Sequence, residues 1–211
     1  MVTVALDVEP EAARPFIEAA GPEHPSLIDR SHLVDELFGI INVPRSVWID
    51  EEGMIVRPFE VSNVQESPVR PGKIDPKLFP PEMLELIRGI KRDPEAYLAA
   101  LRDWAAKGAE SEWALEPHEV IARSTPRSAD SARTAAHFEL GEHLHRRGEI
   151  ESAQRHWREA HRLAPENWTY KRQAWQLLDP GVQGRTDVYD GSWADDIAAS
   201  GPENYSFPLR P

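Results

Sequence analysis

Histidines are the side chains of this sequence best placed to do chemistry near neutral pH. His137, His143 and His145 lie close together, and His156 and His161 follow in the next predicted helix. A helical metal site favours two histidines four residues apart with a carboxylate nearby. Neither the 143/145 pair nor the 156/161 pair has that spacing. We therefore interpret the histidines as a solvent-exposed surface and predict no metal site.

Carboxylates and thiols offer no catalytic pattern either. Asp7, Asp29 and Asp50 each follow an apolar segment, where aspartate commonly forms the turn at the end of a strand. The sequence contains no cysteine. It can therefore form no disulfide, no thiolate zinc site and no thiol nucleophile. We assign no catalytic residue and no cofactor.

The overall composition limits the classes of partner that the protein is expected to bind. The 211 residues are 40% hydrophobic and 28% charged, which is typical of a globular protein, and the net charge is −12. That charge opposes binding to nucleic acid or to an anionic membrane face. No apolar run approaches the roughly 20 residues that span a bilayer, and no signal peptide is visible. We expect a cytoplasmic protein.

The first third of the chain predicts alternating strands and helices. Val2–Leu6 alternates as a strand does, and a helix over Glu11–Ala20 should follow Pro10. After a short extended piece, Ser31 is expected to cap a helix over His32–Phe38. Two further strands, Ser46–Asp50 and Met54–Phe59, are separated by so few residues that they must pair antiparallel.

One stretch of the sequence resembles a known family. It consists of Gly39-Ile40-Ile41-Asn42-Val43-Pro44, the strand Ser46–Asp50 and Glu51-Glu52-Gly53-Met54-Ile55-Val56. It is similar to the second half of thioredoxin-like redoxins of the ResA type and of the alkyl hydroperoxide reductase/thiol-specific antioxidant branch. The resemblance covers residues 1–60. It implies that Pro44 follows a cis peptide bond and that Val43 and Pro44 help to bind an extended substrate by backbone pairing.

The sequence departs from this family in one respect. Family members carry an earlier strand and helix that begins with Cys-x-x-Cys, and this sequence has neither that unit nor any cysteine. Two explanations stay open. The unit is encoded ahead of Met1, for instance with a selenocysteine codon read as a stop, or the protein is a non-catalytic derivative. With that neighbouring strand missing, the Val2–Leu6 strand should have an open edge, which favours a homodimer or aggregation unless the C-terminal tail covers it.

The second half of the chain predicts helices. The spacing of eight residues within 137–165 resembles that of a tetratricopeptide repeat and predicts an antiparallel helix pair there. These residues are Leu140, Gly141, Leu144, Gly148, Ala153, Trp157, Ala160 and Pro165. Small residues at Gly141, Ala153 and Ala160 should allow the two helices to approach closely. Such repeats suggest a protein or peptide partner.

Together these patterns predict an α/β fold, an incomplete thioredoxin-like sheet with helices followed by an all-α tetratricopeptide-like domain. We expect a partial thioredoxin-like domain at 1–60, a proline-rich connector at 61–80, a helical domain at 81–180 and an irregular tail at 181–211. The resemblance implies a thiol (or selenol) disulfide or peroxide oxidoreductase that is inactive without its redox motif. The alternative is a non-catalytic interaction module that uses the helical repeat.

Overall fold

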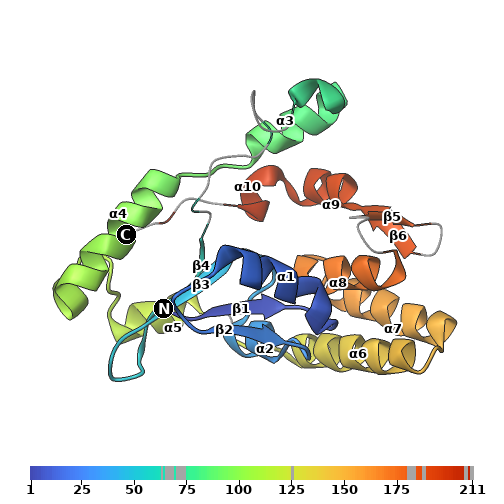
Figure 1. Cartoon of the computed structure of the whole chain (residues 1–211), viewed down its shortest axis with the longest axis horizontal. Helices are drawn as coiled ribbons and strands as arrows, with labels where there is room; N and C mark the ends of the chain where they lie inside the picture. The colour runs from blue at the N-terminus through green and yellow to red at the C-terminus, as the bar shows by residue number, and fades with distance from the viewer. Residues whose placement is uncertain are drawn as a thin grey trace. The chain divides into compact units, whose positions relative to one another are not determined.

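A computed structural model shows the fold of the protein (Figure 1). It describes residues 1–62, 64, 69, 75–124, 126–179, 184–186, 189–206 and 209, with only the backbone given for 184–186 and 189–190. The chain is mixed α/β, rich in helix, with few strands. It divides into two compact units. Unit 1 comprises Met1–Ile41 with Pro126–Asp190, and unit 2 comprises Asn42–Thr125 with Gly191–Pro211.

Unit 1 begins with the predicted strand and helix. Strand β1 (Thr3–Leu6) pairs in parallel with β2 (Ser26–Asp29), so that Thr3 lies opposite Ser26. Helix α1 (Pro10–Ala20) makes the connection, starting at a proline and ending at Gly21 in the left-handed conformation. A crossover helix is the usual way to bring two successive strands parallel. The expected strand and helix are confirmed.

Helix α2 (Leu33–Phe38) starts differently from the prediction. Its cap position is His32, which has a left-handed backbone with φ 56°, and Ser31 does not cap the helix. The Asp29 carboxylate instead accepts the Val34 backbone N–H at 2.7 Å and the Ser31 N–H at 3.1 Å. A carboxylate satisfies the free amides of a helix start better than a hydroxyl does, because its acceptor oxygens are charged.

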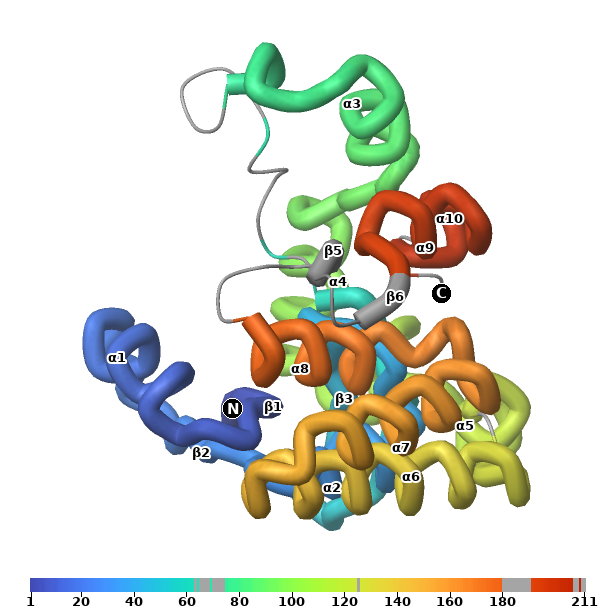
Figure 2. Tube along the Cα trace, turned by 90° about the vertical axis from the view of Figure 1, so that its right-hand side faces the viewer, coloured from blue at the N-terminus to red at the C-terminus, as the bar shows by residue number. Residues whose placement is uncertain are grey.

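The helical hairpin of unit 1 is confirmed. Helices α6 (Ala129–Arg146) and α7 (Ile150–Leu163) run antiparallel across the turn at Gly148. A Cβ added to Gly141 would lie 2.5 Å from the Trp157 ring, so only glycine fits there. Ala153, Trp157 and Ala160 are fully buried. Helix α8 (Trp168–Leu178) packs next to α7 (Figure 2), followed by strands β5 (Gly184–Thr186) and β6 (Tyr189–Ser192).

The N-terminal elements belong to the same unit as this hairpin. Gln173 of α8 accepts hydrogen bonds from the Val8 N–H and from the His32 ring, both at 3.3 Å. The Trp168 N–H donates to the Ile41 carbonyl at 2.8 Å. These buried links explain why the compact units do not coincide with the sequential division expected at residues 60, 80 and 180.

Unit 2 is built around a β-hairpin. Strand β3 (Arg45–Ile49) pairs antiparallel with β4 (Ile55–Val61), as predicted. The turn between them is held by Asp50, whose carboxylate accepts the N–H groups of Glu52 and Met54. Gly53 in this turn has φ 81°, which favours glycine.

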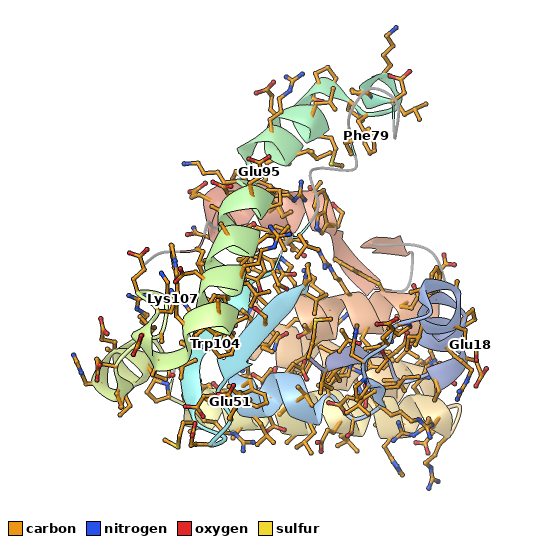
Figure 3. All side chains as sticks on the ribbon, turned by 60° about the vertical axis from the view of Figure 1, so that its left-hand side comes forward. Glu18, Glu51, Phe79, Glu95, Trp104 and Lys107 are labelled. Atoms are coloured by element: carbon orange, nitrogen blue, oxygen red, sulfur yellow. The ribbon has the colours of Figure 1, made fainter. Side chains whose placement is uncertain are left out.

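The core of unit 2 lies between this hairpin and helix α4 (Pro94–Lys107). The buried ring of Trp48 stacks on Trp104 of α4 with ring centres 5.0 Å apart and meets Tyr97 edge to face. Figure 3 labels Trp104 on α4. Arg57 is fully buried beside Trp48 and donates to the Trp113 carbonyl at 2.9 Å. The remaining short elements are η1 (Pro76–Leu78), α3 (Pro81–Gly89), η2 (Gly108–Glu110) and α5 (Pro117–Arg123).

The end of the chain is more regular than predicted. The expected irregular tail contains helices α9 (Trp193–Ser200) and α10 (Pro202–Tyr205). That part of the prediction is wrong because Ser192 caps α9 by accepting the Asp195 N–H, and because Ile197 is fully buried in unit 2. Half of the proline-rich connector predicted at 61–80 lies outside the described residues, and its described part includes the end of β4 and η1.

Candidate functional site

The two residues predicted to bind substrate lie directly ahead of strand β3. The peptide bond between Val43 and Pro44 is cis, as the resemblance implied. The Pro44 carbonyl accepts the Ser62 N–H at 3.3 Å, which joins the loop to the end of β4. The Val43 side chain is 41% exposed, so an apolar group projects from the loop into solvent.

Neighbouring Asn42 controls the backbone of this loop. Its side-chain oxygen accepts the Val43 N–H at 2.9 Å, and its side-chain nitrogen donates to the Tyr205 carbonyl at 3.1 Å. Asn42 is buried. The Val43 N–H is thus already paired, whereas no described residue donates a hydrogen bond to the Val43 carbonyl.

A small pocket of about 60 Å³ lies beside this loop, within unit 2. Both predicted site residues line it. The lining also includes residues from β3, β4 and the α3–α4 connection and from the C-terminal segment; the full set is Asn42, Val43, Pro44, Arg45, Val61, Arg92, Tyr205 and Ser206. None of these residues is a histidine or a carboxylate.

Two arginines give the pocket its charge. Burial lowers the pKa of Arg45 to about 10, although the negative charge of Glu60 partly offsets the effect. Burial also lowers the pKa of Arg92. A guanidinium stays protonated at neutral pH even so. The pocket therefore presents positive charge in a protein whose net charge is −12.

The C-terminal segment fixes one wall of the pocket. The Ser206 hydroxyl donates to the Lys91 carbonyl at 2.9 Å, and the Tyr205 hydroxyl accepts the Trp193 indole N–H at 3.2 Å.

Sequence reasoning found Val43 and Pro44 but missed the arginines and the tail. Arg92 lies 47 positions beyond Arg45, and the tail residues lie more than 100 positions beyond both. No local pattern connects them. The one feature of the sequence that could have pointed to the pocket arginines was the position of Arg45 immediately after Pro44.

The histidines predicted to be surface residues are brought together in one case. His137 of α6 and His156 of α7 face each other with their Nδ1 atoms 2.9 Å apart. One ring must donate and the other accept, and burial together with the neighbouring charge of His137 lowers the pKa of His156. Among the described residues, no group of three or more potential ligands is arranged to hold a metal ion.

A buried polar cluster in unit 1 was not predicted at all. His32 Nδ1 lies 3.0 Å from an Asp35 carboxylate oxygen, and His32 Nε2 faces Gln173. Both ring nitrogens face acceptors, which favours the charged imidazolium. Burial lowers the pKa of His32, but the hydrogen bond and charge of Asp35 and the charge of Glu142 outweigh it, so the pKa is raised. The i, i+3 spacing of His32 and Asp35 was the only signal in the sequence.

Glu142 completes this cluster from helix α6. Burial raises the pKa of its carboxyl to about 7, although the charges of His32 and Arg146 oppose the shift. Its Oε1 atom is buried and has no hydrogen-bond partner among the described residues. His32, Asp35 and Glu142 are each at most 2% exposed, so the cluster contributes to stability rather than contacting a substrate.

Comparison of the chain with protein-family models, with curated proteins and with solved structures finds no match. Within the part of the chain that the structure describes, no helix is both long and apolar enough to cross a bilayer.

Proposed function

We propose that this protein is a thioredoxin-like binding protein that holds an extended peptide against the Val43–Pro44 loop. The observation that carries the proposal is that both residues line one pocket, with the Val43 side chain exposed and its carbonyl facing no described donor. An extended peptide can pair with such a carbonyl and place alternate side chains in the pocket. The resemblance of residues 1–60 to thioredoxin-like redoxins supports the same role.

The proposed relation to thiol (or selenol) oxidoreductases concerns binding, not turnover. The sequence has no cysteine, and no residue lining the pocket can act as a base. A disulfide or peroxide substrate needs a thiolate or selenolate to attack it. This chain would therefore hold a substrate-like segment and leave redox chemistry to another group. We place this activity in the cytoplasm, as expected from the sequence.

An array of short extended peptides tests the proposal. We expect purified protein to bind a subset of peptides and Val43→Asp to lose binding, because the new carboxylate must be desolvated at the contact. Met54→Asp is the matched control, since Met54 is an exposed apolar residue at the far turn of the same hairpin. Loss of binding in both variants, or in neither, would refute the assignment of the site.

A second candidate function is protein binding through the α6–α7 hairpin. The supporting observation is the close packing of Gly141 on Trp157, the contact that a tetratricopeptide pair requires. Binding would use the outer surface of the repeat. In a pull-down experiment, a partner protein that still binds the Val43→Asp variant, but no longer binds when exposed residues of α7 are changed, favours this alternative.

The open edge of β1 suggests self-association. Strand β1 pairs with β2 only, among the described strands. Unpaired strand edges recruit another chain, and a second copy offers an identical edge. We propose a homodimer formed through β1.

A further inference from the structure

Among the described residues, none pairs with the charge of Arg92. It lies between helices α3 and α4, is half-buried, and lines the pocket beside Val43 and Pro44. No described residue forms a hydrogen bond or an ion pair with it. The adjacent Asp93 carboxylate accepts the Ala96 N–H at 2.9 Å and so serves as the cap of α4. Removing a guanidinium from water without a counter-charge is costly, which makes this an unusual place for an arginine.

Arg45 adds a second cation to the same pocket. The negative charge of Glu60 acts on Arg45, but that carboxylate accepts a hydrogen bond from the Arg57 Nε at 3.1 Å and also feels the charge of Arg123. One carboxylate therefore faces three arginines. Arg45 and Arg92 thus both bring positive charge to the lining of the pocket.

The size of the pocket limits the ligand. Its volume of about 60 Å³ compares with the roughly 30 Å³ that one water molecule occupies in the liquid. A carboxylate group fits such a space. Guanidinium groups bind carboxylates through planar, charge-assisted hydrogen bonds, which are stronger than neutral ones.

We propose that this pocket is a receptor for a carboxylate, carried by an acidic side chain of an extended peptide and recognised by Arg92 together with Arg45. The inference rests on the proposed peptide-binding function and specifies its ligand. A peptide paired with the Val43 carbonyl, which accepts no hydrogen bond from a described residue, runs past the pocket, so one of its side chains enters it. Free inorganic phosphate carries the same oxyanion chemistry, and the experiment separates the two sources.

The test compares pairs of peptides that differ only by glutamate or glutamine. Binding is measured by calorimetry with the full chain, with inorganic phosphate and acetate titrated separately. We expect the glutamate peptide to bind about tenfold or more tightly than its twin. Arg92→Gln should abolish the difference, and Arg92→Lys should restore part of it. Arg88→Gln is the control, because Arg88 is an exposed α3 arginine paired with Glu85, and it should leave the difference intact.

The possible outcomes separate this inference from the proposed function. If both twins bind equally and Val43→Asp removes both, peptide binding stands and the carboxylate receptor is overturned. If phosphate binds through Arg92 but no peptide does, both the proposed peptide-binding function and the receptor for a peptide carboxylate are overturned. If Arg92→Gln and Arg88→Gln weaken the glutamate peptide equally, general charge attraction explains the preference and the receptor is again overturned. Melting curves of each variant confirm that it is folded.

Discussion

The side chain of Asn42 joins the loop at Val43 to the C-terminal segment at Tyr205. It accepts the Val43 N–H at 2.9 Å and donates to the Tyr205 carbonyl at 3.1 Å, 163 residues further along the chain. A single buried amide therefore holds two walls of the pocket at once. An amide is suited to this task because it offers an acceptor and donors from one planar group.

Replacing Asn42 with alanine should destabilise unit 2 by about 1–3 kcal/mol, because it leaves a backbone N–H and a carbonyl without partners. Urea unfolding followed by tryptophan fluorescence measures the change. Asn204→Ala is the control, since Asn204 is exposed and water can replace its hydrogen bond to Ser200. It should cost less than about 0.5 kcal/mol. Similar losses in the two variants would show that Asn42 does not join the walls.

The purified chain should show no disulfide reductase or peroxidase turnover. No residue in its sequence can form a thiolate or a selenolate, which both reactions require of their nucleophile. The measurement is dithiol-dependent reduction of a disulfide or peroxide compared with a no-enzyme reaction. Turnover above that background, reproduced in independent preparations, contradicts the prediction.

Local patterns predicted most of the individual elements. Alternation identified β1, β3 and β4, and helical spacing identified α1 and the α6–α7 hairpin. Each of these signals arises from neighbours along the chain, such as Gly141 and Leu144 one turn apart. The cis bond before Pro44 followed from a resemblance rather than from physical argument.

The assembly of these elements could not be predicted. Unit 1 combines the first 41 residues with the hairpin because Gln173 bonds to both Val8 and His32, which are more than 140 residues away. The pocket likewise depends on Arg92 and Tyr205 meeting Val43. Long-range polar contacts of this kind leave no periodic trace in a sequence. The tail was misread because its helices are short, and the Ser192 cap and the burial of Ile197 show why α9 forms.

Ala153→Leu should overpack the α6–α7 contact and cost about 1–3 kcal/mol, because Ala153 is fully buried. Glu151→Leu introduces the same side chain at an exposed position two residues away and should cost less than about 0.5 kcal/mol. Thermal melting of both variants gives the comparison. Equal shifts would mean that the hairpin is not packed as described, and the repeat-based alternative function would fall with it.

The homodimer prediction can be tested on one edge of β1. The Thr3 N–H donates to the carbonyl of Pro25, just ahead of β2, and the Asp7 N–H donates to that of Asp29. Because amides alternate along a strand, the N–H groups of Val4 and Leu6 face the open edge. Val4→Pro removes an open-edge donor while leaving the β1–β2 ladder intact, so it should abolish the dimer without unfolding the protein. Sedimentation velocity measures the association state.

Ala5→Pro provides the matched control for that experiment. The Ala5 amide faces β2, so a proline there should break the ladder and lower the melting temperature. If wild-type protein remains a monomer at high concentration, the dimer proposal is rejected directly. A Val4→Pro variant that still dimerises would place the interface elsewhere.

Stability should fall as the pH rises from about 4.5 to above 7, because of the buried cluster in unit 1. Burial raises the pKa of Glu142 from 4.5 to about 7. The folded protein thus binds this proton more tightly than the unfolded chain, and the resulting stabilisation is complete at low pH and lost as the pH passes the folded pKa. His32, whose pKa is also raised, contributes in the same direction.

Glu142→Gln isolates the carboxyl's part of this effect. The neutral amide mimics the protonated acid, so the variant should match wild type near pH 4.5 and exceed its unfolding free energy by about 1–3 kcal/mol at pH 8. Glu151→Gln, at an exposed position of α7 and not among the groups that shift the Glu142 pKa, should follow the wild-type profile. Asp35, Arg146 and Glu139 also act on the Glu142 carboxyl, and their charges stay the same in the Glu142→Gln variant. Urea unfolding at several pH values gives the profiles, and a variant as pH-dependent as wild type would show that Glu142 is not the group that titrates.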